Sequence, residues 1–202
     1  STSRGLGDAY KRHMTAKTMR NLNRIIFINS ANIPYADDIY LDGNVHFIGT
    51  QGVGKSTVLR SILFFYNADT QKLGIPVEKQ SYTEYYFPYA NSYIIYEVAT
   101  ENGAFCILSF KSMNRVSYRF IDSPYRKEFF IDPETRIAYT GADRVRMQLD
   151  LQNVDYSRII YTFDEYRNIL YGNGVSSDMK KYSLMESKQY QNCLLYTSPS
   201  PR

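Results

Sequence analysis

The 202-residue sequence lacks tryptophan and contains only two cysteines and two histidines. Two cysteines, Cys106 and Cys193, are too few for a disulfide framework or a zinc site, and two histidines cannot form a His-based metal cluster. There is no apolar run of about 18 residues, so the sequence predicts no membrane-spanning helix. The polar N-terminus also lacks a secretory signal. These absences favour a reducing, cytoplasmic environment, with Cys106 as a core residue of a strand.

The rest of the composition is that of an ordinary folded protein, with 44% hydrophobic and 22% charged residues. A disordered or collagen-like chain is therefore excluded. The net charge of +4 is unevenly distributed, because residues 1–24 carry six basic residues and one acidic residue, whereas the remainder has a net charge of −1. Such a basic arm either binds nucleic acid by neutralising phosphates or is a solvated tail.

Both ends of the chain differ from its middle. We predict a basic, disordered arm over residues 1–19, with Met14 or Met19 as an alternative natural start, and one folded unit over residues 20–192. Residues 193–202 (CLLYTSPSPR) resemble the translation of a sequencing adapter, and a Ser/Pro-rich stretch has no means of forming a core. We therefore exclude this tail from the fold and expect the chain to be the front piece of a longer protein.

Hydrophobic patterning predicts a mixture of strands and helices. Runs of β-branched and aromatic residues at 92–98, 104–110 and 115–121 are strand-length, and the turns between them are so short that they favour an antiparallel meander. Further strands are predicted at 24–29, 39–42, 45–48 and 158–162, a small hairpin at 127–139, helices at 143–151 and 163–171, and irregular structure at 70–91.

A further helix is predicted to begin at Lys55. Apolar residues follow it at positions i, i+1, i+4 and i+7, which predicts a buried face made of Val58, Leu59, Ile62 and Phe65. A strand before residue 49 and a helix from residue 55 enclose a glycine-rich loop.

That loop matches a phosphate-binding pattern at every fixed position. Residues 49–56 (GTQGVGKS) fit G-x-x-x-x-G-K-[ST], the P-loop or Walker A motif. The glycines allow backbone N–H groups to converge on phosphate oxygens, and the N-terminus of the following helix adds positive potential. The alternative is a glycine-rich turn with a solvated lysine. The predicted ATP-binding residues are Gly49, Thr50, Gln51, Gly52, Val53, Gly54, Lys55, Ser56 and Thr57.

Within the motif, Lys55 is assigned to the β- and γ-phosphates as the catalytic cation, Ser56 to Mg²⁺, and Thr57 to the α-phosphate. Hydrolysis usually also needs an acidic residue after a buried strand. The nearest candidates are Asp122 and Asp132, but charged residues interrupt or flank both runs. No Asn-Lys-x-Asp motif and no Arg-rich lid is present, which disfavours a GTPase and a nucleotide kinase.

Three stretches carry a resemblance to a known family. Residues 24–32 (RIIFINSAN), 45–57 (VHFIGTQGVGKST) and 63–69 (LFFYNAD) resemble the N-terminal head segment of bacterial SMC-like ATPases, closest to the condensin-like Mks/Wadjet type of the SMC/Rad50 class. The similarity continues through residues 163–172 and 182–192 and thus covers roughly residues 20–192.

This resemblance implies an α/β fold, namely the N-terminal lobe of an ABC-type P-loop NTPase head with a mixed sheet and an antiparallel β meander. It implies ATP and Mg²⁺ as ligands, with a C-terminal lobe, reached through a long coiled coil, that supplies the signature motif, the Walker B strand and the catalytic glutamate. Two such heads sandwich ATP and act on DNA in the full complex, without a membrane. The chain alone would then bind ATP without hydrolysing it, and its loop at residues 29–35 would lie near the nucleotide.

One feature departs from the family pattern. ABC heads usually place a Mg²⁺-contacting Gln after the meander, but the corresponding strand at 158–162 has none, and Gln148 and Gln152 lie upstream on a predicted helix. Two alternatives stay open. One is a self-contained P-loop phosphotransferase or other NTPase acting on a small molecule; the other is a nucleic-acid-binding module that uses the basic arm. The 20 tyrosines, spread along the chain without basic interleaving, indicate packing rather than base stacking.

Overall fold

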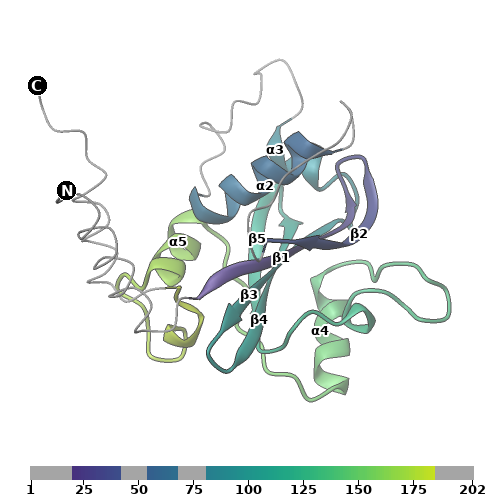
Figure 1. The fold of residues 1–202 in the computed structure, drawn as a ribbon. Helices are drawn as coiled ribbons and strands as arrows, with labels where there is room; N and C mark the ends of the chain where they lie inside the picture. Colours follow the sequence, from purple (N-terminus) through teal and green to yellow (C-terminus); the bar gives the residue numbers. More distant parts are fainter. Residues whose placement is uncertain (1–19, 42–53, 68–80, 185–202) are drawn as a thin grey trace, which may run out of the picture.

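The computed structural model describes residues 20–41, 54–67 and 81–184. Their centre is a five-stranded antiparallel sheet in the order β2-β1-β3-β4-β5 (Figure 1). The last three strands form the predicted meander, which is confirmed. The strands are β1 (Asn21–Ser30), β2 (Ile33–Tyr40), β3 (Tyr93–Thr100), β4 (Gly103–Ser112) and β5 (Arg115–Ile121).

Helices cover both faces of this sheet. One apolar cluster joins the sheet to α2, α3, α5 and η3, and a second joins the opposite face to η2 and α4 (Figure 1). Because both faces are covered, β3, β4 and β5 are buried at most positions rather than at alternating ones. The helices are α2 (Lys55–Asn67), α3 (Tyr82–Tyr86), α4 (Ala142–Leu151) and α5 (Phe163–Tyr171), with short 3₁₀ turns η2 (Lys127–Phe129) and η3 (Lys180–Tyr182).

The pairing of the strands corrects the expectation of a mixed sheet for the described residues. All four pairings are antiparallel. A two-residue turn, Ala31–Asn32, joins β1 to β2, and two-residue turns also join the meander strands, a length that permits only antiparallel neighbours. The strand predicted at 45–48 lies outside the described residues.

The two edge strands are protected differently. β2 begins six residues earlier than predicted and contains Pro34. Proline has no N–H to donate, and an edge strand tolerates it because one side of that strand has no neighbouring strand to pair with. At the other edge, the segment predicted as a strand at 158–162 forms only a single bridge, between Ile160 and Tyr118 of β5. Ser157 N also donates to Phe120 O at 2.8 Å, so this segment covers the free edge of β5.

The helix predicted from Lys55 is confirmed as α2, but its buried face was predicted only in part. Val58 and Phe65 are buried as expected, whereas Leu59 is 48% exposed. The helix turns Ser61 and Phe64 toward the sheet instead, which moves Leu59 to the solvent side. Leu63 and Tyr66 share that outer face with Leu59 at i, i+4 and i+7.

Three other local predictions can be compared with the structure. The helix at 163–171 is confirmed as α5, and Gly172 ends it with φ of +70° in the left-handed region. α3 interrupts the stretch predicted to be irregular, because Ser81 Oγ accepts a hydrogen bond from Glu84 N at 3.3 Å and caps this short helix. At 127–139 the chain forms the 3₁₀ turn η2 and then a single antiparallel bridge, Ile131 with Ala138.

Tyrosine hydroxyl groups fasten α2 to its neighbours. Tyr96 of β3 donates to Ser61 O at 3.0 Å, Tyr166 of α5 donates to Phe65 O at 2.7 Å, and Tyr171 donates to Tyr66 O at 2.6 Å. Carbonyls in the last turn of a helix have no partner within the helix. The two α5 tyrosines therefore satisfy the C-terminal end of α2, and this agrees with a packing role for the tyrosines.

Replacing Tyr166 with phenylalanine is expected to destabilise the fold by about 1–3 kcal/mol, because a buried carbonyl loses its donor while the ring stays in place. The ring stacks on Tyr118 at a centroid distance of 4.1 Å. Urea unfolding would measure the change, with Tyr161→Phe as the control because Tyr161 is 50% exposed. Equal effects of the two substitutions would contradict the proposed role of the hydroxyl.

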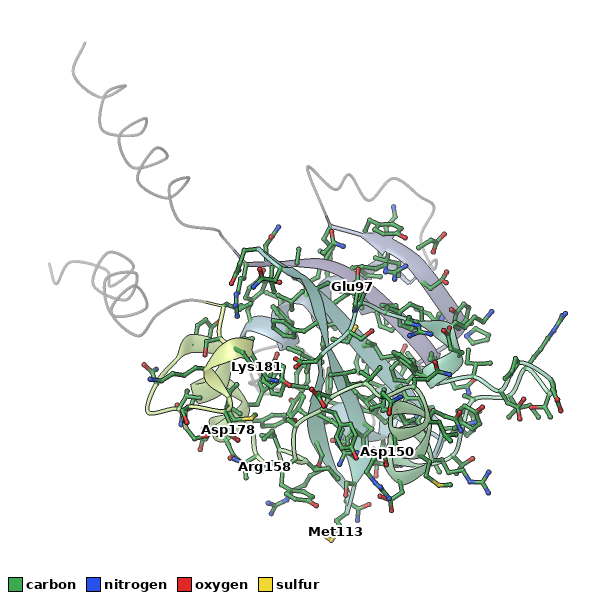
Figure 2. The ribbon with its side chains drawn as sticks, turned by 90° about the horizontal axis from the view of Figure 1, so that it is seen from below. Glu97, Met113, Asp150, Arg158, Asp178 and Lys181 are labelled. Carbon is green, nitrogen blue, oxygen red and sulfur yellow. The ribbon has the colours of Figure 1, made fainter. Side chains whose placement is uncertain are left out.

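A charge network around Glu97, which Figure 2 labels, ties the segment after β5 to the sheet. Glu97 of β3, only 6% exposed, accepts hydrogen bonds from Asn23 Nδ2 at 3.0 Å, Arg24 Nη2 at 3.2 Å and Tyr125 N at 2.7 Å. The Arg24 guanidinium lies between the rings of Tyr40 and Tyr125, 5.2 and 5.0 Å from their centroids. Burial by itself lowers the pKa of Arg24, but Glu97 more than offsets this and the pKa is raised.

Among the residues that the structure describes, no helix has the length and apolarity needed to cross a bilayer.

Candidate functional site

The structure describes the second half of the predicted phosphate-binding motif. Gly54 immediately precedes α2, and Lys55, Ser56 and Thr57 form the first turn of that helix. The other predicted ligands, Gly49, Thr50, Gln51, Gly52 and Val53, lie outside the described residues, as does the predicted strand before them. The helix expected after the loop is thus observed, whereas most of the loop lies outside the described residues.

Gly54 occupies a conformation that requires glycine. Its φ is +75°, in the left-handed region, where an L side chain is strained. Among the described residues, a Cβ at this position would meet only Ile33, with Cδ1 at 3.5 Å and Cγ1 at 3.9 Å, which are ordinary contacts. The backbone conformation, and not a lack of space, therefore explains the last glycine of the motif. Val58 N donates to Gly54 O at 3.0 Å and closes the first turn of α2.

The start of α2 has the electrostatic character of an anion site. Its first turn contains no acidic residue and does contain Lys55, which is half-buried. The first turn of a helix leaves N–H groups outside the intrahelical pattern, and the helix dipole places partial positive charge there. Ser56 is exposed and Thr57 is buried. A single serine oxygen suits Mg²⁺, which takes one or two protein oxygens together with phosphates and waters.

Two other elements meet this helix start. The first residue of β2, Ile33, lies beside Gly54, whereas the predicted proximity of residues 29–35 to the nucleotide stays a prediction. At the end of β1, Ser30 Oγ donates to Tyr86 O of α3 at 2.7 Å. Tyr86 is fully buried, which raises its pKa, while the nearby side chains of Arg60 and Thr57 lower it in part. α3 and the β1–β2 turn therefore support the first turns of α2.

Tyr86 is the site residue that the sequence reasoning missed. The stretch around it was predicted to be irregular, although Ser81 and Glu84 have the S-x-x-E spacing of a capping box. The S-x-x-E spacing, followed by the aromatic residues Tyr86 and Phe87, was the signal in the sequence for a helix packed beside the motif.

The two acidic residues considered for the Mg²⁺ site have other partners. Asp122 follows β5 and forms an ion pair with Lys181. Asp132 Oδ1 accepts from Glu134 N at 2.8 Å and so stabilises its own turn. Gln152, which lies upstream of the strand where the family has its Mg²⁺-contacting Gln, is exposed just after α4 and accepts from Arg126 at 3.3 Å. None of these three contacts involves the start of α2.

The described end of the basic arm is engaged by the fold. Arg20 forms an ion pair with Glu101 at 2.8 Å and donates to Ser183 O, whereas Arg24 belongs to the Glu97 network. These two cations of residues 1–24 are therefore structural. Residues 1–19 lie outside the described part of the chain, so nucleic-acid binding by the arm stays a prediction.

The described residues contain no cluster of three or more His, Cys, Asp or Glu residues suited to a metal ion. Cys106 is buried in β4, opposite Glu97, as predicted for a core residue. Burial also raises the pKa of its thiol well above the usual value, which makes it a poor nucleophile.

Comparison with known proteins identifies a family for this chain. Residues 26–192 match the family described as "Protein of unknown function (DUF3584)", a range that runs from β1 to beyond η3. No curated protein and no solved structure matches the chain.

Proposed function

This chain belongs to the DUF3584 family, and we propose that it is the ATP-binding N-terminal lobe of an SMC-like ATPase that handles DNA. In this proposal ATP binds at residues 49–57 with Mg²⁺ on Ser56. Hydrolysis requires a C-terminal lobe and a second head, supplied from beyond these residues. The complex would act in the cytoplasm.

One observation carries the proposal. The motif G-x-x-x-x-G-K-S runs directly into α2, and Gly54, the last glycine of the motif, has a left-handed conformation. Lys55 then stands in the first turn of a helix whose start contains no carboxylate. Backbone N–H groups, the helix dipole and one ammonium group favour a polyphosphate at this place. The resemblance of residues 24–32 and 63–69 to SMC-like heads supports the choice of ATPase class.

The site itself supports binding more than turnover. Hydrolysis needs a group that orients the attacking water, usually with a second acidic ligand for Mg²⁺. Asp122 and Asp132, the nearest candidates in the sequence, are engaged in contacts elsewhere. We therefore expect this chain by itself to bind ATP without measurable turnover.

Replacing Lys55 with alanine is expected to weaken ATP binding by at least tenfold, because the charge-assisted hydrogen bonds to the phosphates are lost. Isothermal titration of Mg·ATP into the 202-residue chain measures the change. Lys111→Ala is the matched control, since Lys111 is also half-buried but lies at the end of β4. Circular dichroism verifies that both variants are folded.

Equal ATP affinity of the wild type and the Lys55→Ala variant would refute the phosphate assignment. Phosphate release by the wild-type chain that depends on Lys55 would instead favour the self-contained phosphotransferase or NTPase. In that case an acidic Mg²⁺ ligand must exist within these 202 residues, and Asp122→Asn and Asp132→Asn would identify it.

A further inference from the structure

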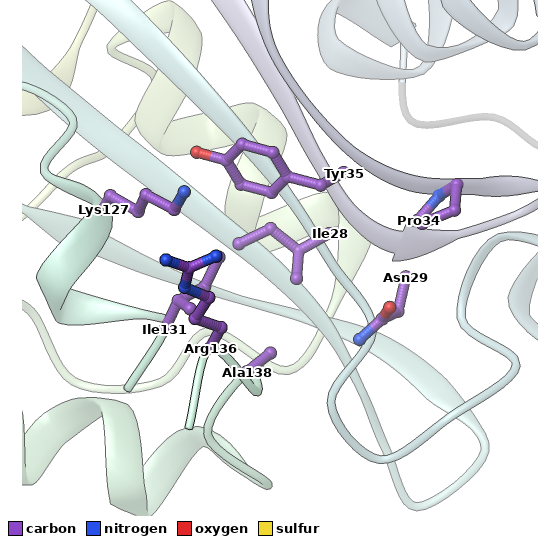
Figure 3. Close-up of a pocket in the computed structure, with 8 residues that line it drawn as sticks. All are labelled: Ile28, Asn29, Pro34, Tyr35, Lys127, Ile131, Arg136 and Ala138. Atoms are coloured by element: carbon purple, nitrogen blue, oxygen red, sulfur yellow. The ribbon is translucent and has the colours of Figure 1, made fainter. Parts of the chain in front are cut away.

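A second site lies on the other face of the sheet. A pocket of about 200 Å³ opens between the β1–β2 hairpin and the turn that follows η2. Ile28, Asn29, Pro34 and Tyr35 line it from the hairpin, and Lys127, Ile131, Arg136 and Ala138 line it from the other side (Figure 3). Ile28, Ile131 and Ala138 belong to the apolar cluster on the α4 face of the sheet, whereas α2 packs on the opposite face.

Two cations converge on this pocket. The ammonium of Lys127 and the guanidinium of Arg136 extend into the same space, in front of Ile28 and Tyr35 (Figure 3). None of the described lining residues is acidic, and neither cation forms an ion pair within the described part of the chain. Two like charges held side by side repel each other unless an anion lies between them.

Two carboxylates on the neighbouring segments, those of Asp37 and Asp132, have other partners. Asp37 accepts a hydrogen bond from the Tyr35 hydroxyl at 2.9 Å, and Asp132 accepts from backbone N–H groups of its own turn. The Tyr35 hydroxyl also contacts the Tyr125 hydroxyl at 2.8 Å, so Tyr35 is held from two sides. These carboxylates therefore leave the charge of the two cations available to a ligand.

The side chain of Lys127 and the backbone of Arg136 are held in place before any ligand arrives. Lys127 Nζ lies 4.7 Å from the centroid of the Tyr35 ring, a cation–π contact. Arg136 has a φ of +60°, a left-handed conformation that is uncommon for arginine, and its N–H donates to Asp132 O at 2.8 Å. Asn29 Nδ2 donates to Asn91 O at 3.4 Å. Non-glycine residues in this backbone region concentrate at ligand sites.

From this geometry we infer that the pocket binds a phosphate group, with Arg136 as a forked donor and Lys127 as a point charge. A guanidinium matches the spacing of two phosphate oxygens. The volume of about 200 Å³ is below that of pockets for drug-sized ligands, so it accommodates a single phosphate and not a whole nucleotide. The ligand is a free phosphate or the terminal phosphate of a small ester. This inference does not depend on ATP binding at α2.

Titration of inorganic phosphate into the 202-residue Lys55→Ala chain tests the site, because that background removes the proposed ATP contact. We expect Arg136→Gln and Lys127→Gln each to weaken binding by about tenfold, and the pair by about 100-fold. Arg115→Gln removes the same charge from an exposed position at the start of β5 and is expected to leave the affinity unchanged. The three glutamine substitutions are on exposed side chains, so circular dichroism should show the same fold as that of the Lys55→Ala background.

Phosphate affinity that is the same in the double variant and in its background would overturn the assignment. So would equal weakening by Arg115→Gln, because the effect would then come from overall charge. A short DNA duplex, titrated in parallel, distinguishes the source of the phosphate. Duplex binding that is lost in the double variant, without any binding of free phosphate, would replace the small ligand by a nucleic-acid backbone and refute the inference as stated.

Discussion

Replacing Glu97 with alanine is expected to lower the free energy of unfolding by about 3–5 kcal/mol, because the substitution leaves the guanidinium of Arg24 buried without its counter-ion. The same substitution removes the acceptor for Asn23 and for the backbone N–H of Tyr125. Three groups that are protected from water thus lose a partner in one step. The loss of stability is the free energy of keeping these groups away from water without a partner, and it exceeds the net contribution of a typical hydrogen bond.

Urea unfolding of the two proteins, followed by circular dichroism, measures this difference. The matched control is Glu101→Ala, which breaks the ion pair with Arg20 near the surface. Arg20 lowers the pKa of Glu101 to about 2, but Glu101 is solvent-exposed, and such pairs contribute roughly 0–1 kcal/mol. A Glu97 variant as stable as the Glu101 variant would show that the network does not stabilise the fold.

Alkaline pH is expected to unfold the protein cooperatively between about pH 10 and 12. Seven tyrosines are at most 4% exposed, and burial raises the pKa of each, in the case of Tyr93 to about 12. In the unfolded chain the same groups ionise near pH 10. The seven tyrosines are Tyr82, Tyr86, Tyr93, Tyr96, Tyr118, Tyr166 and Tyr182.

The direction of this change in stability with pH follows from the number of protons that the folded and unfolded states bind. Above about pH 10 the unfolded chain loses phenolic protons that the folded protein keeps, so stability decreases as pH rises. Below pH 10 both states hold these protons and the contribution is constant. One tyrosine changes the free energy by about 1.4 kcal/mol per pH unit, and seven together by about 10 kcal/mol per pH unit, which is as large as the whole stability of a typical domain.

Parallel measurement of phenolate absorbance and far-ultraviolet circular dichroism against pH tests this expectation. The absorbance of the buried tyrosines should rise together with the loss of secondary structure. Ionisation of all 20 tyrosines with unaltered circular dichroism would contradict it.

The sheet could be predicted where local chemistry decides the outcome. Turns at Glu101–Asn102 and Met113–Asn114 are flanked by long runs rich in β-branched and aromatic residues, and the meander follows from them. The start of β2 could not be predicted, because Pro34 has the same local preferences in a turn and in an edge strand. Which of the two applies depends on the position of β1, which is not a local property.

The candidate site, like the sheet, could be predicted only where it depends on local sequence. The motif and the helix from Lys55 are local features, and both could be read from the sequence. The side of α2 that meets the sheet was not, since Val58 and Leu59 are equally apolar neighbours and tertiary packing selects between them. The Glu97 network and the pocket at Arg136 combine residues that are tens of positions apart, so only the folded chain brings them together.

The hydroxyl groups of Tyr166 and Tyr171 anchor the far end of α2 to α5. Tyr96 of β3 holds the middle of the same helix through Ser61 O. Because three phenolic hydroxyl groups from two different elements fix α2 along its length, the first turn with Lys55 has a set position relative to the sheet.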